Sequence, residues 1–198
     1  TFKCFGCGEG GDVFTFVMKT DGMEFQEALR QLAEEAGIEL PNTRQSPSSE
    51  IKDIGSANAA AASYFRQVLL GDPAGAKARA YSKQRGLSEQ IMDKFALGYA
   101  PSGWDTSTSH LRELGIEDEV LVKSGLSKEG ETGLYDTFRD RLIFPIWTTR
   151  GEVVGFGGRT LGSDGAKYLN TAHTPVFDKG NVLYGLNHAQ SAIKSEKT

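Results

Sequence analysis

The stretch from residue 138 to residue 170 constrains the fold more than any other part of the chain. Residues 142–147 (LIFPIW) form a short apolar run rich in β-branched and aromatic side chains, which is typical of a β-strand. Arg150-Gly151 has the chemistry of a turn, and residues 153–156 (VVGF) resume the extended pattern. We therefore predict an antiparallel hairpin from these two runs.

Basic side chains surround the predicted hairpin. Residues 138–180 contain six Lys or Arg against four Asp or Glu, although the whole chain has a formal net charge of −4. One interpretation is phosphate binding, because guanidinium groups match phosphate oxygens in pairs and nearby glycines let a polyanion approach the backbone. The other is that the arginines form ion pairs at the rim of the sheet. The basic residues nearest the hairpin are Arg139, Arg141, Arg159, Lys167 and Lys179, the glycines are Gly155, Gly157 and Gly158, and the acids are Asp140, Glu152 and Asp164.

Composition limits the class of protein. The chain has 198 residues, 38% of them hydrophobic, and no long apolar run, so we expect one or two globular domains, no membrane segment and no secretory leader. A cytoplasmic location follows as an expectation, and two cysteines fit a reducing compartment. Charge is asymmetric: residues 1–50 hold four bases and nine acids, whereas residues 138–198 hold eight bases and five acids. A polyanion would be drawn toward the second of these segments.

Cys4 and Cys7 are spaced for sharing one metal ion, with glycines beside them that tolerate a tight turn. Zn²⁺ is the expected ion, but a structural zinc site needs four ligands and this pair supplies two. A redox pair or two free thiols are the alternatives. His110, His173 and His188 are isolated in sequence, so we do not expect any of them to complete the site.

Periodicity predicts an α+β protein in two parts. Residues 1–40 form a partial zinc-ribbon subdomain with a helix over 24–36, while the apolar run 12–18 fits either strand or helix. Residues 41–50 are polar and contain prolines, which is typical of a linker. Residues 51–198 form a mixed α+β domain with the hairpin. Its predicted helices span 50–70, 74–84, 88–95 and 107–114, and the acidic run 117–119 is predicted to be a solvated turn.

Six phrases carry a resemblance to a known family. They are YSKQRGLS, LGYAPSGW, FRDRLIFPI, GFGGR, KYLNTAHT and FDKGNVLYGL. In this order, and with the cysteine pair in front, the chain resembles the bacterial DnaG-type DNA primases. The match corresponds to the second half of the zinc-binding domain and the N-terminal part of the RNA polymerase domain, ending before the Toprim segment. Two departures put the rigidity of one loop in doubt, because the family's usual Asn-Ser-Pro-acid-Thr is NTAHT here and Ala166 replaces a proline.

The resemblance implies a role for particular residues. The predicted template-binding residues are Arg85, Arg139, Arg141, Arg159 and Lys179. We expect these basic side chains, remote in sequence, to converge into a single cradle once the chain is folded. The predicted nucleotide-binding residues are Lys167, Tyr168 and Asn170. Cys4 and Cys7 would be half of a zinc site whose other ligands, a Cys and a His, precede them in the family.

The resemblance also implies an activity. Members synthesise short RNA primers from nucleoside triphosphates on single-stranded DNA with Mg²⁺, and the catalytic acids lie in the Toprim segment. We therefore expect no catalytic residue in this chain and no primer synthesis by it alone. Expected partners are single-stranded DNA, nucleoside triphosphates, the RNA–DNA primer duplex and, through a C-terminal domain, the replicative helicase. The alternatives are a non-enzymatic zinc-dependent nucleic-acid-binding module and a purely structural interaction domain.

Overall fold

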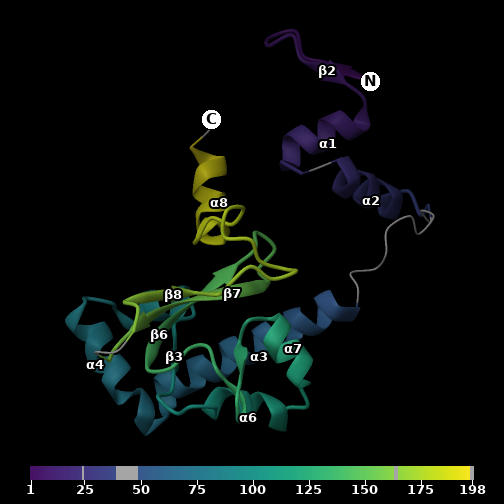
Figure 1. Ribbon diagram of the computed structural model, residues 1–198. Helices are drawn as coiled ribbons and strands as arrows, with labels where there is room; N and C mark the ends of the chain where they lie inside the picture. The colour runs from purple at the N-terminus through teal and green to yellow at the C-terminus, as the bar shows by residue number, and fades with distance from the viewer. Residues whose placement is uncertain (24, 39–48, 163–164, 197–198) are drawn as a thin grey trace. The chain divides into compact units, whose positions relative to one another are not determined.

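A computed structural model of the chain describes residues 1–23, 25–38, 49–162 and 165–196 (Figure 1). The chain forms two compact units, residues 1–46 and 47–198, and each is described by itself. Most of the predicted linker lies outside the described residues. No helix in the described ranges combines the length and the apolar character that crossing a membrane requires.

The first unit contains a two-stranded antiparallel ribbon followed by two helices. These are β1 (Phe2–Lys3), β2 (Gly10–Gly11), α1 (Val13–Asp21) and α2 (Phe25–Glu35). The apolar run that fits strand or helix by sequence is helical, because Asp12 caps it by accepting a hydrogen bond from the Thr15 N–H at 2.8 Å. Gly37 has φ +66° beyond the end of α2, and the Ile38 N–H donates to the Ala33 carbonyl at 2.8 Å.

Helices make up about half of the second unit. They are α3 (Ser49–Gly71), a 3₁₀ turn η1 (Pro73–Gly75), α4 (Ala76–Gln84), α5 (Glu89–Lys94), α6 (Thr106–Glu113), α7 (Asp118–Lys123) and α8 (Leu186–Ser195). The structure confirms the helices predicted over 50–70, 74–84, 88–95 and 107–114. The prediction of a solvated turn over 117–119 is wrong, because Asp118 and Glu119 form the first turn of α7, where carboxylates favour the helix dipole.

A four-stranded antiparallel sheet lies beside α3 (Figure 1). Its order is β3 (Gly98–Ala100), β6 (Arg141–Trp147), β7 (Val153–Thr160) and β8 (Tyr168–Asn170), and a separate hairpin joins β4 (Ser127–Gly130) to β5 (Gly133–Asp136). The β6–β7 pair is the predicted hairpin, and Gly151 in its turn has φ +83°. Arg159 lies opposite Leu142 on one side and Tyr168 on the other, so these three side chains share one face of the sheet.

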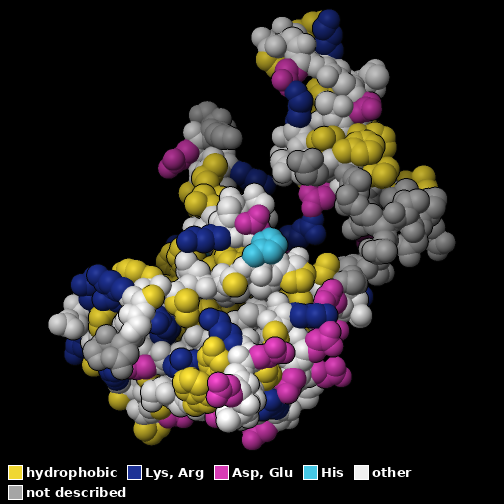
Figure 2. Space-filling model, in the orientation of Figure 1, with side chains coloured by type: hydrophobic (Ala, Val, Ile, Leu, Met, Phe, Trp, Pro, Cys, Tyr) yellow, Lys and Arg dark blue, Asp and Glu magenta, His cyan; other side chains and the backbone are white. Residues whose placement is uncertain are grey.

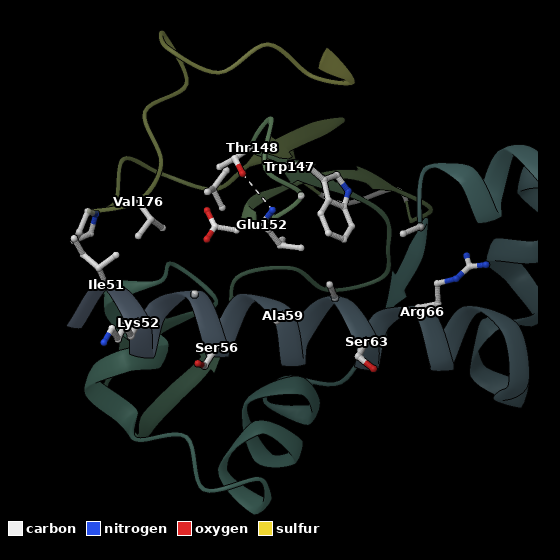
Figure 3. Close-up of a pocket in the computed structure, with 17 residues that line it drawn as sticks. Ile51, Lys52, Ser56, Ala59, Ser63, Arg66, Trp147, Thr148, Glu152 and Val176 are labelled. Atoms are coloured by element: carbon white, nitrogen blue, oxygen red, sulfur yellow. Dashed lines mark hydrogen bonds between the residues drawn. The ribbon is translucent and has the colours of Figure 1, made fainter. Parts of the chain in front are cut away.

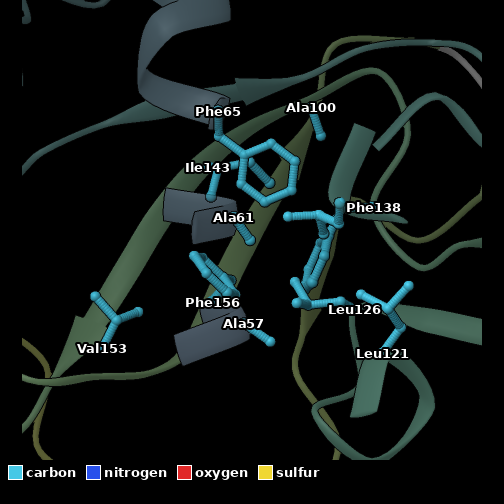
Figure 4. Packing of buried hydrophobic residues seen from close by; sticks show 11 residues of the cluster. Ala57, Ala61, Phe65, Ala100, Leu121, Leu126, Phe138, Ile143, Val153 and Phe156 are labelled. Atoms are coloured by element: carbon cyan, nitrogen blue, oxygen red, sulfur yellow. The ribbon is translucent and has the colours of Figure 1, made fainter. Parts of the chain in front are cut away.

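The main core fills the space between α3 and the opposite face of the sheet (Figure 4). Phe156 from β7 makes edge-on contacts with Phe65 of α3 and Phe138, at centroid distances of 5.6 and 6.1 Å. Each such ring contributes on the order of 2–3 kcal/mol when removed from water. A second cluster lies where α4 and α5 cover Leu142 and Tyr99. Helices therefore pack on both faces of the sheet, and α3 with its core covers most of one face.

Candidate nucleic-acid interface

Cationic and aromatic side chains alternate along one face of the sheet. The guanidinium carbon of Arg159 lies 5.8 Å from the Tyr81 ring centroid and 5.0 Å from the Tyr168 ring centroid. Its Nε donates to the Tyr81 hydroxyl at 3.1 Å. Arg85 lies over the other end of this row, 6.0 Å from Tyr81, and the Lys167 ammonium lies 5.8 Å from Tyr168. We call these five residues, which lie in or next to α4, β7 and β8, the cationic ladder.

Beside the ladder is an apolar slot of about 420 Å³. Its walls come from the sheet and from residues 177–184, and it is lined by Phe144, Ile146, Gly157, Gly158, Tyr168, Asn170, Phe177, Lys179, Val182 and Tyr184. The predicted residues Tyr168, Asn170 and Lys179 therefore meet in one place. Aromatic walls with an amide and an ammonium at the rim have the chemistry that binds a planar base carrying phosphate groups.

A second pocket, of about 660 Å³ and with basic side chains in its lining, lies on the opposite face of the sheet, at the β8 edge. Its lining is mostly polar and contains Lys128, Tyr135, Thr137, Arg139, Asp140, Arg141, Thr160, Gly162, Gly165 and Leu169. The Thr137 hydroxyl in this lining is buried and has no hydrogen-bond partner among the described residues. We call this site the guanidinium pocket.

Arg139 in the guanidinium pocket rests on two aromatic rings. Its guanidinium carbon is 4.6 Å from the Trp104 ring centroid and 5.3 Å from that of Tyr135, and these two rings stack at 4.9 Å. Arg139 also donates to the Asp136 carbonyl. Trp104 is 59% exposed, which is unusual for so large an apolar side chain and suits stacking on a base. Sequence reasoning did not select Trp104, Tyr135 or Tyr81.

Arg141 is the most buried of the predicted site residues, at 8% exposure. One of its guanidinium nitrogens donates to the carbonyls of Ala166 at 3.0 Å and Gly158 at 3.3 Å. Burial lowers the pKa of Arg141, yet its basicity is high enough for the side chain to stay charged at neutral pH. Arg141 therefore ties β6 to β7 and to the segment before β8, while its remaining donors line the guanidinium pocket.

None of the described acids forms a direct ion pair with these arginines, although Asp140 lies in the same pocket lining as Arg139 and Arg141. Within the described ranges, Arg139, Arg141 and Arg159 form no ion pair; Asp140 pairs instead with Lys77 of α4 at 2.6 Å. On the α6–α7 side, by contrast, Arg112 pairs with Asp118, and Lys123 pairs with both Glu50 and Glu119. Figure 2 shows the acidic side chains gathered over α6 and α7 and the basic ones over α4 and β8. Ion pairs with Asp140 or Glu152 therefore do not account for the three arginines, and Asp164 lies outside the described residues.

The predicted residues form two clusters rather than one cradle. Arg85, Arg159, Lys167, Tyr168, Asn170 and Lys179 belong to the ladder and the slot, whereas Arg139 and Arg141 belong to the guanidinium pocket. Side chains alternate along a strand, so Arg159 and its neighbour Thr160, which pairs with Arg141, point to opposite faces. The two clusters border the same edge of the sheet at β8.

The glycines of β7 have a different role from the one expected. A Cβ on Gly158 would lie 2.8 Å from Phe138, and one on Gly155 would lie 3.2 Å from Phe177. At both positions the protein's own rings fill the space that a side chain would take, so the missing side chain serves packing there, while the Gly158 backbone still lines the slot. Of Gly155, Gly157 and Gly158, only Gly157 is partly exposed. A Cβ added there would have the Asn170 side-chain oxygen, in the slot, as its nearest neighbour.

A larger cavity, of about 1100 Å³, lies elsewhere (Figure 3). It is a groove between small residues of α3, such as Ser56 and Ala59, and the β6–β7 turn with Trp147. The backbone N–H of Glu152 donates to the Thr148 hydroxyl at 3.2 Å, which fixes that turn. The lining of this groove is mainly apolar and includes none of the residues predicted to bind nucleic acid or nucleotide, so we do not place the interface there.

Cys4 and Cys7 are both exposed and have free thiols. Cys4 forms a tight turn with two backbone bonds: its N–H donates to the Glu9 carbonyl at 2.6 Å, and the Gly8 N–H donates to the Cys4 carbonyl at 2.9 Å. Hydrogen bonds from the Cys7 backbone and thiol lower the pKa of Cys4, which favours the thiolate that binds metals. Among the described residues no third His, Cys, Asp or Glu joins the pair, so the donors fit half of a tetrahedral zinc site.

Comparison with known protein families separates the chain into the same two parts. Residues 64–190 match the family described as the DNA primase catalytic core, N-terminal domain, and residues 1–48 match the CHC2 zinc finger. The four-stranded sheet and its helices are thus a primase-core N-terminal domain that follows a zinc-finger region.

Individual relatives agree with this class. The DNA primase of Mycobacterium tuberculosis is 44% identical over 201 residues, which cover 97% of this chain and 31% of the relative. The RNA polymerase domain of primase DnaG from the same organism, in complex with a double-stranded DNA oligomer with a 6-nucleotide overhang, is 42% identical with a TM-score of 0.69. That match covers 73% of this chain and 46% of that one.

A DnaG primase catalytic domain bound to ssDNA is 38% identical with a TM-score of 0.66, over 73% of this chain and 45% of that one. The chain belongs to the bacterial DnaG-type DNA primase family. It spans about a third of the length of the curated relatives that it matches.

Proposed function

We propose that this chain is the part of a DNA primase that holds the single-stranded DNA template and the incoming nucleoside triphosphate. The observation that carries the proposal is the cationic ladder, in which Arg159 is held between Tyr81 and Tyr168 without a carboxylate partner among the described residues. An arginine fixed in this way keeps its full charge for phosphate groups. The relatives whose structures contain DNA support the same class of ligand.

The template would follow the basic residues on both sides of the β8 edge. The proposed template contacts are Arg85, Arg139, Arg141, Arg159 and Lys179. Trp104 and Tyr135 extend this set, because a stacked pair of rings beneath a guanidinium offers a planar surface to an unpaired base. Backbone phosphates would supply most of the affinity and the stacked bases would fix the position of the strand.

The nucleotide would enter the slot. Tyr168 is 63% exposed and presents its ring to a base, while Lys167 and Lys179 present ammonium groups to the phosphates. The Asn170 side-chain oxygen, next to Gly157, can accept a hydrogen bond from the base or the sugar. Loss of the Tyr168 ring would cost about 1–3 kcal/mol of binding free energy if a base stacks there.

Zinc and magnesium would act at different places. Cys4 and Cys7 would hold zinc together with two ligands from outside the described residues, and the ion would stabilise the small first unit. Magnesium in this family serves the chemical step, whose carboxylate ligands the resemblance places in the Toprim segment. We expect the 198-residue chain to bind DNA and nucleotide without making primers, and primer synthesis by it would contradict this.

Salt dependence of single-stranded DNA binding tests the template site. If the five cations each neutralise one phosphate, the slope of log K against log salt is roughly −0.7 × 5, or about −3.5. A fourfold rise in salt should then weaken binding on the order of 10², measured by fluorescence anisotropy of a labelled oligonucleotide. A response to salt that is flat over this range would refute the proposal.

Variants separate specific contacts from overall charge. Arg159→Ala should lower DNA affinity and reduce the slope by about 0.7. Arg112→Ala is the matched control, since it also removes one arginine charge, but from the ion pair with Asp118 on α6 and α7. Equal losses in the two variants would show that net charge, and not the ladder, determines binding.

A further inference from the structure

Asp140 has a backbone conformation that is rare for its residue type. Its φ is +46°, and among the described residues only Ala96 shares a positive φ without being glycine. It lies between Arg139 and Arg141, the two arginines of the guanidinium pocket. A residue held in the left-handed region persists only where its surroundings fix it, and such positions cluster at binding sites.

Four interactions fix Asp140. Its N–H donates to the Pro101 carbonyl at 3.1 Å, and its carbonyl accepts from the Leu161 N–H at 2.9 Å. Its carboxylate accepts from the Tyr99 hydroxyl at 2.9 Å and from the Lys77 ammonium at 2.6 Å. The backbone and side chain of this one residue are therefore tied to β3, to the loop after it, to the end of β7 and to α4.

The conformation of Asp140 decides where its neighbours point. In an extended strand, residues two positions apart lie on the same face, so Arg139 and Arg141 would be parallel. Here Arg139 instead lies on the rings of Trp104 and Tyr135, whereas Arg141 turns into the sheet and bonds the carbonyls of Ala166 and Gly158. The two guanidinium groups reach the guanidinium pocket from different directions.

We propose that Asp140 is a positioning residue for template binding: its anchored left-handed conformation aims Arg139 and Arg141 into one pocket. Lys77 has a second effect in this arrangement, because it neutralises a carboxylate that would otherwise repel phosphate in the pocket lining. The inference rests on the proposed function, since it assumes that these arginines contact the template.

Three substitutions separate the conformation from the charge. Asp140→Asn keeps the acceptor for Tyr99 and tolerates positive φ, so it should bind single-stranded DNA within about twofold of wild type. Asp140→Ala loses the two side-chain anchors, to Tyr99 and Lys77, and disfavours positive φ. It should bind about tenfold or more weakly, as expected when charge-assisted contacts are lost. Asp140→Gly adopts the backbone conformation freely but also lacks the two side-chain anchors, so its affinity should lie between those of Asp140→Asn and Asp140→Ala.

The salt slope distinguishes positioning from a loss of stability. If Asp140→Ala disengages both arginines, the slope should become shallower by about 0.7 × 2, or 1.4, at temperatures well below unfolding. Asp118→Ala is the matched control: it removes one carboxylate from an exposed ion pair and changes the net charge equally, and we expect its slope to equal that of wild type. If Asp140→Ala does not fold, Asp140→Gly provides the same comparison.

The outcomes also separate this inference from the proposed function. Arg139→Ala combined with Arg141→Ala should weaken binding and reduce the slope; if it does neither, the template site itself is misplaced. If that double variant weakens binding but Asp140→Ala and Asp140→Gly both match wild type, only the positioning role fails. Asp140→Asn binding as weakly as Asp140→Ala would equally overturn it, because the carboxylate charge would then be what matters.

Discussion

Substitution of Gly158 by alanine tests whether β7 glycines serve packing or ligand access. The added methyl group would lie 2.8 Å from Phe138 Cδ1 and 3.0 Å from Arg141 Cδ, and both neighbours are buried. Neither can withdraw without disturbing the core or the bonds that Arg141 makes to backbone carbonyls. Gly158 does not have a positive φ, so the backbone itself accepts alanine and the effect isolates the steric clash.

The expected loss of stability follows from two opposing contributions. Forcing a methyl group into a filled core costs about 1–3 kcal/mol. Replacing glycine by alanine also reduces the conformational freedom of the unfolded chain, which raises the free energy of unfolding by about 0.5 kcal/mol. The free energy of unfolding should therefore fall by about 0.5–2.5 kcal/mol. This corresponds to a decrease in Tm of roughly 1–10 °C for a unit of this size.

Gly157→Ala is the matched control one residue away. Its added methyl group would lie 3.1 Å from the Asn170 side-chain oxygen, and this exposed side chain can move; Phe144, at 3.9 Å, is at ordinary van der Waals distance. We expect unchanged stability but weaker nucleotide binding, because the methyl group enters the slot. Both tryptophans, Trp104 and Trp147, lie in the second unit, so tryptophan fluorescence in urea follows its unfolding. An unchanged midpoint for Gly158→Ala, or an equal loss for Gly157→Ala, would refute the reasoning.

Three further measurements address other parts of the second unit. Asp136→Asn should destabilise it by about 2–3 kcal/mol in urea unfolding, because the buried carboxylate accepts three bonds near 2.8 Å, two of them from Thr108, and an amide nitrogen cannot accept. Ser88→Ala should cost about 1 kcal/mol in the same assay, since this hydroxyl caps α5; no change would contradict the capping role. In Trp147→Phe protein, oligonucleotide binding should quench the remaining Trp104 fluorescence, and constant emission on saturation would remove Trp104 from the interface.

The sequence predicted the parts of the fold whose signals are local. The β6–β7 hairpin has alternating apolar residues on both sides of a turn that needs Gly151, and α3 has helical periodicity over many turns. Shorter elements escaped prediction. The β4–β5 hairpin is polar and four residues long on each side, and α7 has six residues, so neither shows enough periods for a pattern. The sequence does not decide between strand and helix for the run 12–18, whereas the Asp12 cap seen in the structure does.

The residues of the candidate site likewise differ in whether the sequence could predict them. The resemblance supplied the cations Arg85, Arg139 and Arg159 because they stand in recognisable phrases. Tyr81 and Trp104 stand in two of the same phrases, YSKQRGLS and LGYAPSGW, but the resemblance assigned them no role. Their contacts with Arg159, 78 positions away, and with Arg139 are tertiary and show only in the fold. The acids near the hairpin suggested ion pairs, yet their partners depend on tertiary contacts that no local pattern contains.

What a cation touches, rather than how many cations there are, determines whether this acidic chain can hold a polyanion. On α6 and α7 each described base pairs with carboxylates, so that surface offers a phosphate little net attraction. At the β8 edge the guanidinium groups are held by aromatic rings and backbone carbonyls, which orient them without cancelling their charge. A formal charge of −4 is therefore compatible with a strongly positive local field, because the negative charges are gathered over other elements. Moving one acid to the ladder should weaken DNA binding more than adding the same charge to α7.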